Sequence, residues 1–196
     1  VKPLPKGLDF TGQLRHANVK FLADQTYIDI QGQQQVDQHI FKEVFQLIDQ
    51  AQTTIVLDMF LFNQEVGESK VKQFPLMQQL TDALILKRKL YPAMQIVVIT
   101  DPINSVYGGI TPQHYRQLRQ AGVDVIETDL KPLRASNPLW SGFWYICCQN
   151  LGNNPEGGWL SNPFGKDKVT LRSYLELLNF KANHRKTLVV DTAQGW

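Results

Sequence analysis

The stretch "TTIVLDMFLF", residues 53–62, is almost wholly apolar and rich in residues that favour β-structure. An apolar run of this length without polar alternation is typical of a strand that is covered on both faces of a sheet. We therefore expect residues 53–62 to form a central strand. Asp58 is the charged residue inside this run, and if it is buried it must be hydrogen-bonded, so we favour a structural role for it.

The sequence on both sides of this strand alternates between strand and helix patterns. Residues 26–32 alternate like a short strand, and residues 35–52 carry apolar side chains at the spacing of an amphipathic helix. The alternation predicts an α/β fold, with helices packed on a mixed, largely parallel sheet. The further elements that we expect downstream are helices over 71–90 and 112–121, a buried strand over 94–101 and a third strand over 123–128.

This alternation stops at Thr128, where a long excursion over residues 128–183 begins. The excursion contains clusters of Pro, Asn and Gly, and its aromatic content argues against disorder. We expect two short helices within it, at 138–149 and 170–180, and a last apolar strand at 186–191. Four aromatic residues of the excursion have two possible roles. They either form an apolar lid or lipid-facing surface, or pack the excursion onto the rest of the domain: Trp140, Phe143, Trp144 and Tyr145.

The length and composition of the chain limit the functions that it can have. A chain of 196 residues favours one domain, and a net charge of +2 gives no broad basic surface for nucleic acid. The densest cationic group, residues 87–89, ends a predicted helix and suits a solvated face as well as a nucleic-acid groove. No apolar run reaches the roughly 18–20 residues that span a bilayer. Cys147 and Cys148 are adjacent, and we expect a buried pair of free thiols in a helix.

Two acidic residues follow buried strands. Glu65 and Asp101 come after the strands at 53–62 and 94–101, and in open α/β sheets ligands bind beyond the carboxyl ends of the strands. Both residues are therefore candidates for a cleft. Asp101 equally suits a turn carboxylate that caps the loop after it.

The stretch "NHRKTLVVD", residues 183–191, joins cations to the last strand. His184 and Lys186 are two residues apart, so on a strand they share a face, with Cβ atoms about 7 Å apart. An imidazole and an ammonium at this spacing suit convergence on one phosphate. Asp191 has the opposite parity and lies about 23 Å from His184 along a straight strand, so we expect it to anchor the far end.

These residues fit the pattern H-x-K-x-x-x-x-D, preceded by Asn183, and residues 26–191 resemble the phospholipase D superfamily, in its bacterial cardiolipin-synthase-like branch. The resemblance implies a phospholipase D-like α/β domain that forms one half of a pseudo-two-fold, bilobal enzyme. It implies a phosphodiesterase or phosphatidyltransferase that works through a phosphohistidine, without metal or cofactor. It also implies His184 as nucleophile or general acid, Lys186 as phosphate clamp, Asp191 as the motif aspartate and Asn183 as a substrate-binding residue.

A second copy of the motif is absent from the 196 residues, because His16, His39 and His114 have no lysine two positions later. The chain thus looks like the first half of a two-motif enzyme, with a lead segment at 1–25 and a first domain at 26–196 that is incomplete at its carboxyl end. The partners that follow are a phospholipid, an alcohol or water acceptor, and a carboxyl-terminal half or a homodimer mate. A membrane surface in a bacterium is a further expected partner.

Two alternatives stay open. One is an endonuclease of the same superfamily, although the near-balanced charge makes nucleic acid the less expected partner. The other is a non-catalytic module that binds phosphate or acts as a scaffold. His184 and Lys186 argue against that module, whereas the missing second motif argues for it.

Overall fold

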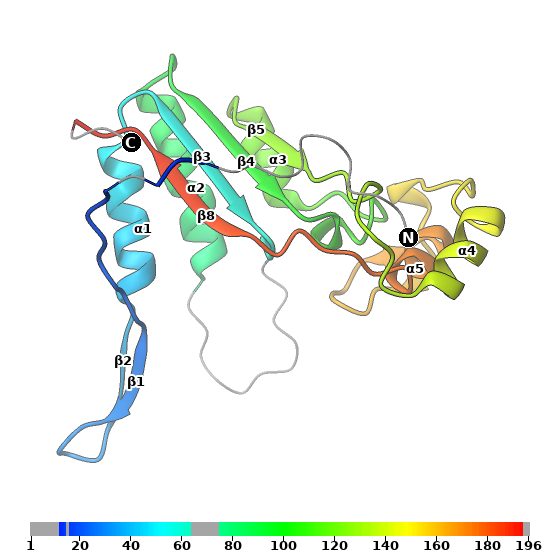
Figure 1. The fold of residues 1–196 in the computed structure, drawn as a ribbon, viewed down its shortest axis with the longest axis horizontal. Coiled ribbons are helices and arrows are strands. Elements are labelled where there is room, and N and C mark those ends of the chain that lie inside the picture. The colour runs from blue at the N-terminus through cyan, green and yellow to red at the C-terminus, as the bar shows by residue number, and fades with distance from the viewer. Residues whose placement is uncertain (1–11, 15, 64–74, 194–196) are drawn as a thin grey trace.

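Four strands form the main sheet of the molecule, in the order β5-β4-β3-β8 (Figure 1). The computed structural model describes residues 12–14, 16–63 and 75–193. Strands β3 (Thr54–Met59), β4 (Gln95–Thr100) and β5 (Asp124–Glu127) are parallel, and β8 (Lys186–Val190) runs antiparallel to β3. With five helices flanking this mixed, largely parallel sheet, the predicted α/β class is confirmed.

Three helices cover one face of the sheet: α1 (His39–Gln50), α2 (Leu76–Leu90) and α3 (Gln113–Gln120). Alternate strand residues face them, so Ile55 and Leu57 of β3 join Leu84 of α2 in one core, each at most 2% exposed. The other face is more open within the described residues, since Val56 is half-buried and Val189 is 46% exposed. The central position of β3 was predicted correctly, but equal covering of both its faces was not.

The first amino-terminal strand was predicted, but the elements that follow it differ from the prediction. Strands β1 (Gln25–Ile28) and β2 (Gln34–Asp37) form a separate antiparallel hairpin that projects away from the sheet (Figure 1). The predicted helix start at residue 35 is therefore wrong, and α1 begins at His39. The turn chemistry explains this, because the Asp29 carboxylate accepts hydrogen bonds from the backbone of Gln31 and Gln33, and Gly32 adopts φ 76°.

Helix α2 begins at Leu76, and residues 71–74 of the predicted helix lie outside the described residues. After β4, the loop forms a short 3-10 helix, η1 (Pro102–Ser105). Val106 and Tyr107 then adopt left-handed backbone angles, with φ 48° and 52°. A left-handed β-branched residue is unfavourable, so tertiary packing must hold this loop, and both side chains are indeed buried.

The excursion folds into a lobe beyond the carboxyl ends of β3 and β4 (Figure 1). It contains the two predicted helices, α4 (Pro138–Cys147) and α5 (Leu171–Leu177). The indole of Trp140 donates to the carbonyl oxygen of Leu175 at 3.3 Å and ties the two helices together. The smaller elements of the lobe are η2 (Pro155–Gly157), β6 (Leu160–Ser161) and β7 (Lys168–Val169). Among the described residues, no helix combines the length and apolar character of a membrane span.

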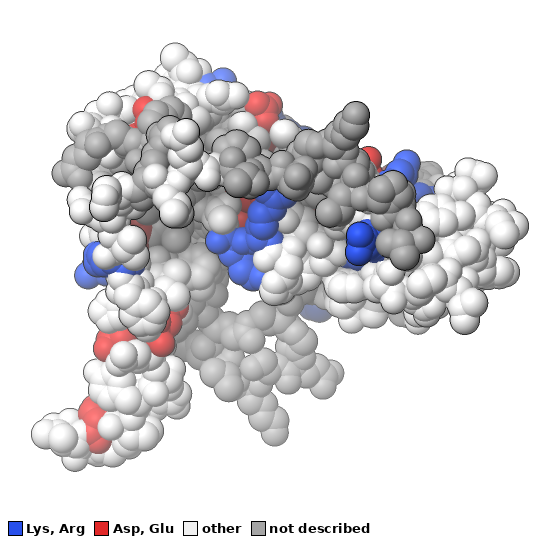
Figure 2. Space-filling model, viewed as in Figure 1, with Lys and Arg blue, Asp and Glu red and all other residues white. Residues whose placement is uncertain are grey.

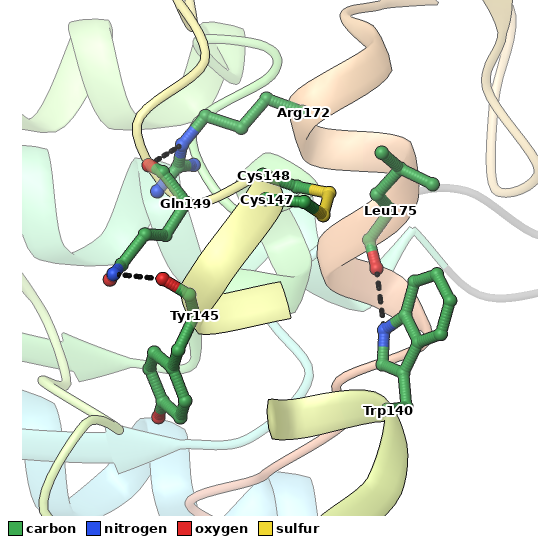
Figure 3. The surroundings of a disulfide bond; sticks show 7 residues. All are labelled: Trp140, Tyr145, Cys147, Cys148, Gln149, Arg172 and Leu175. Atoms are coloured by element: carbon green, nitrogen blue, oxygen red, sulfur yellow. Dashed lines mark hydrogen bonds between the residues drawn. A yellow bond between two sulfur atoms is a disulfide. The ribbon is translucent and has the colours of Figure 1, made fainter. Parts of the chain in front are cut away.

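The end of α4 carries a disulfide between Cys147 and Cys148 (Figure 3), so the expectation of two free thiols is wrong. The bridge lies where the helix stops. Cys148 is the carboxyl-terminal cap residue, and its φ of −124° departs from helical geometry. Gln149 then donates to the carbonyl oxygen of Tyr145 at 2.6 Å, and Arg172 donates to the carbonyl oxygen of Gln149 at 3.1 Å.

Candidate phosphate site at the start of strand β8

His184 and Lys186 meet at the exposed start of β8. The Lys186 ammonium lies 3.0 Å from Nδ1 and 3.1 Å from Nε2 of the His184 ring, and it donates to the His184 carbonyl oxygen at 3.1 Å. The tautomer decides which ring nitrogen can accept from the ammonium. The arrangement thus brings an imidazole and a positive charge together at one solvent-accessible point.

Phe60 supports both side chains from the end of β3. Its ring centroid lies 4.6 Å from that of His184 and 5.2 Å from the Lys186 ammonium, a cation–π distance. The Phe60 backbone N–H donates to the Arg185 carbonyl oxygen at 2.9 Å, which extends the β3–β8 pairing past Met59 and Lys186. Sequence reasoning missed Phe60, because no local signal in the sequence says that β8 pairs with β3.

Asn183 lies directly before His184 and is buried, with 7% of its surface exposed. Its side-chain amide donates to the Asp58 carboxylate and to the Thr128 hydroxyl, each at 3.0 Å. Both N–H groups of the amide are therefore used to hold the motif against β3 and the start of the excursion. Direct contact between Asn183 and a phosphate stays a prediction.

Arg185 adds a second cation that sequence reasoning did not single out. Its guanidinium Nε donates to the Asn183 amide oxygen at 3.1 Å and lies 3.5 Å from the Asp58 carboxylate. The Arg185 side chain is nevertheless 70% exposed, so most of its surface faces solvent beside His184. The sequence signal that could have identified Arg185 is its position between His184 and Lys186 in "NHRK". Asp58, which is 4% exposed, has the structural role that we favoured.

Asp101 fixes the backbone at the same end of the motif. It is fully buried and accepts from the backbone N–H of Asn183 at 2.6 Å and of Ile103 at 2.9 Å. Burial raises the pKa of the Asp101 carboxyl, and the two hydrogen bonds oppose that rise. Asp101 therefore caps the loop after β4 and does not face a cleft. Glu65, the other candidate carboxylate, lies outside the described residues.

Asp191 holds the opposite end of β8. Its carboxylate accepts from the Thr53 hydroxyl at 2.6 Å, from the Thr53 backbone N–H at 2.9 Å and from the Thr54 backbone N–H at 2.7 Å. The bond from the Thr53 hydroxyl is the main cause that lowers the pKa of Asp191 to about 2. Asp191 thus anchors the start of β3, and the length of β8 separates it from His184.

The other histidines of the chain do not join this site. His114 is 8% exposed, its Nε2 lies 2.6 Å from the Phe62 carbonyl oxygen, and burial lowers its pKa. His39 opens α1 and His16 precedes the hairpin, both exposed. Within residues 12–14, 16–63 and 75–193, no group of three His, Cys, Asp or Glu side chains is placed to hold a metal ion.

A pocket of about 350 Å³ lies between the η1 loop and the excursion lobe. It is lined by residues that include Thr128, Lys181, Arg172 and Glu176, but not by His184. Comparison with known proteins adds no assignment, because no family model, no curated protein and no solved structure matches the chain.

Proposed function

We propose that this chain supplies the motif-bearing half of a phosphodiesterase or phosphatidyltransferase that acts on phospholipids. One observation carries the proposal: the Lys186 ammonium lies within 3.1 Å of both ring nitrogens of His184 at an exposed strand end. A phosphodiester is anionic and repels nucleophiles. A site for it therefore needs a nucleophile and a fixed positive charge together, and this strand end offers both.

The proposed reaction has two displacements. In the first, an unprotonated nitrogen of His184 attacks phosphorus, a P–N bond forms, and the P–O bond to the leaving alcohol breaks. In the second, water or another alcohol attacks phosphorus, its proton passes to a base, and the P–N bond breaks to release His184. Lys186, with Arg185 beside it, stabilises the charge on the non-bridging oxygens in both steps.

The leaving oxygen needs a proton from the side opposite to His184, because attack and departure at phosphorus are in line. One imidazole cannot occupy both sides of the phosphorus atom. We therefore propose that the donor is a second histidine, supplied by a carboxyl-terminal half of the same protein or by a second copy of this chain. On this view the described α/β domain is one half of a phospholipase D-like, pseudo-two-fold enzyme.

The proposal is tested with the complete protein, phosphatidylglycerol, an alcohol acceptor and excess EDTA. We expect release of the head group, and an acid-labile phosphoprotein intermediate that is trapped by rapid quenching and is absent from His184→Ala. His39→Ala is the matched control, because His39 is equally exposed but has no lysine partner, and it should keep full activity. Normal turnover by His184→Ala would refute the proposal, and a parallel assay with single-stranded DNA separates lipid from nucleic-acid substrates.

A further inference from the structure

Two buried hydrogen-bond donors lie in the wall of the pocket between the η1 loop and the excursion lobe. Lys181 is 8% exposed and Asn179 is 7% exposed, and both side chains belong to residues that line this pocket. The volume of about 350 Å³ lies within the range of small-molecule sites, which runs from about 300 to 1,000 Å³. A charged side chain is rarely buried this deeply unless another group pairs with it. The partners of the two side chains therefore show what the pocket can bind.

The ammonium of Lys181 has hydrogen-bond acceptors but no ion-pair partner. It donates to the Tyr145 hydroxyl at 3.2 Å and to the Lys131 carbonyl oxygen at 3.4 Å, and both bonds are long for an N–H donor. Within the part of the chain that the structure describes, no carboxylate lies within 4.0 Å of this ammonium. An ammonium has three N–H groups, so one of them is left for a ligand.

Asn179 adds a second unused donor to the same pocket. Its amide oxygen accepts from the Ser141 hydroxyl, which joins α4 to the residues that follow α5. Its amide nitrogen has no hydrogen-bond partner among the described residues. A buried N–H group without a partner costs free energy, and a ligand oxygen in the pocket would remove this cost.

The carboxylate nearest to these donors is already neutralised. Glu176 pairs with Arg172 at 2.9 Å, and Gln149 accepts a further hydrogen bond from Arg172 through its carbonyl oxygen (Figure 3). Burial raises the pKa of the Glu176 carboxyl, and the charges of three cations oppose that rise: Arg172, Lys131 and Lys181. Three cations thus act on one carboxylate, which leaves an excess of positive charge in this wall.

The two other acidic residues of the pocket lining do not cancel this excess. Burial raises the pKa of Glu127, and its Oε1 has no hydrogen-bond partner among the residues that the structure describes. The neutral acid is therefore the favoured form of Glu127. Asp129 is exposed to solvent, and its carboxylate accepts from the backbone N–H of Lys131 at 3.0 Å.

We infer that this pocket is a binding site for a small organic anion, either a phosphate ester or a carboxylate. The Lys181 ammonium and the Asn179 amide donate to the oxygens of the anion, and the bond from the ammonium is the stronger because it is charge-assisted. Leu130 and Trp144 are buried in the same lining and contact the carbon skeleton. On the face seen in Figure 2 the outer surface of the lobe is largely white, so it offers an anion few competing cations there.

The pocket adjoins the motif of the proposed active site without including it. Thr128 lines the pocket, and its hydroxyl accepts from Asn183, the residue before His184. His184 itself does not line the pocket. Binding of the anion needs no chemistry at His184, so this inference goes beyond the proposed function and the two can fail separately.

The test is isothermal titration calorimetry of the 196-residue chain with glycerol phosphate, glycerate and glycerol, at neutral pH and low salt. The three probes share a carbon skeleton, but only the first two are anions. We expect an anion to bind, with an affinity that falls as salt is added, and glycerol not to bind. The stronger of the two anions tells whether the site prefers a phosphate or a carboxylate.

Two variants and a matched control assign the binding to this pocket. Lys181→Met keeps the apolar stem but removes the charge, and it should weaken anion binding at least about tenfold. Asn179→Asp keeps an oxygen for Ser141 but replaces the donor by a carboxylate, and it should weaken binding by at least as much. Lys87→Met is the matched control, because Lys87 is 6% exposed but does not line the pocket. The control and His184→Ala should bind like the unmodified chain.

Three results would overturn the inference. The first is that neither anion binds to the unmodified chain. The second is that glycerol binds as tightly as the anions, because charge would then play no part. The third is that folded Lys181→Met or Asn179→Asp, checked by circular dichroism, binds the anion like the control. Intact anion binding together with an inactive complete enzyme would refute the proposed function and leave the anion site standing.

Discussion

Replacing Asn183 by alanine removes the amide that joins the start of β8 to two other segments. The amide donates to Asp58 and to Thr128, each at 3.0 Å, and accepts from Arg185 at 3.1 Å. Alanine keeps the backbone N–H that binds Asp101, so the variant tests the side chain alone. If Asn183 served only to bind substrate, the variant would keep its full stability in the absence of substrate.

The expected loss of stability follows from these contacts. A hydrogen bond to a charged group contributes about 1.5–3 kcal/mol, and one between neutral groups contributes about 0.5–1.5 kcal/mol. Asp58 is 4% exposed, so its Oδ1 loses a partner in a place with little water. Arg185 stays 3.5 Å from the other carboxylate oxygen and limits the penalty. The low ends of these ranges are about 1.5 kcal/mol for the bond to Asp58 and about 0.5 kcal/mol for the bond to Thr128. The bond from Arg185 adds little because that side chain is 70% exposed, so we expect a loss of about 2 kcal/mol.

The assay is urea denaturation at neutral pH. With a denaturant slope of about 2–3 kcal/mol per molar urea, the midpoint should fall by about 1 M. Asn150→Ala is the matched control, because Asn150 is an exposed asparagine whose loss should change stability by no more than about 0.5 kcal/mol. Adding Asp58→Asn to Asn183→Ala should restore part of the loss, because it removes a buried charge that has lost its hydrogen bond from Asn183. A loss below about 1 kcal/mol would refute the hydrogen-bond reasoning.

Four further outcomes are expected. In the complete enzyme, His184→Ala and Lys186→Ala should abolish turnover while leaving the urea midpoint unchanged, since both side chains are exposed. Lys186→Arg should also have low turnover, because a planar guanidinium does not replace the compact charge of an ammonium. A monomeric 196-residue chain should show no phosphodiesterase activity until a separately expressed carboxyl-terminal half is added; robust turnover by the monomer would contradict the half-site argument. EDTA should leave the activity of the complete enzyme intact, and a loss that magnesium or zinc restores would defeat the proposed roles. Asp191→Asn should lower the urea midpoint at pH 7, because folding lowers the pKa of Asp191 from 3.8 to about 2. The ionised carboxylate therefore stabilises the fold fully above pH 3.8, and this stabilisation is lost as the pH falls through about 2, where variant and parent should converge.

The central strands were predictable because their pattern is local. Residues 53–62, 94–101 and 186–191 are mostly apolar, residues 123–128 mix apolar and polar side chains, and each of these segments contains a strand of the sheet. The first strand of the hairpin was predicted, but β2 was missed because the apolar residues that follow Gln35 also fit a helical period. The Asp29 turn decided between the two readings, and its hydrogen bonds are visible only once the chain is folded.

The candidate site also has one part that was predictable from the sequence and one part that was not. His184 and Lys186 were predicted from a spacing of two residues, which needs only the geometry of a strand. Phe60 and the bond between Asn183 and Asp58 were not, because they join residues more than 120 positions apart: Asn183 and Asp58 are separated by 125 residues. Such contacts depend on the register of β8 against β3, which no local pattern fixes.

Two carboxylates hold the ends of the motif segment, and they differ in their effect on stability. At the far end, hydrogen bonds lower the pKa of Asp191, so its ionised form stabilises the fold at neutral pH. At the His184 end, burial raises the pKa of Asp101, so stability is gained as the pH falls through its folded pKa, and the ionised form is unfavourable above it. An unfavourable buried charge is retained where it holds the backbone N–H of Asn183, the residue before His184. This asymmetry is expected if Asp101 serves the position of His184 rather than the stability of the sheet.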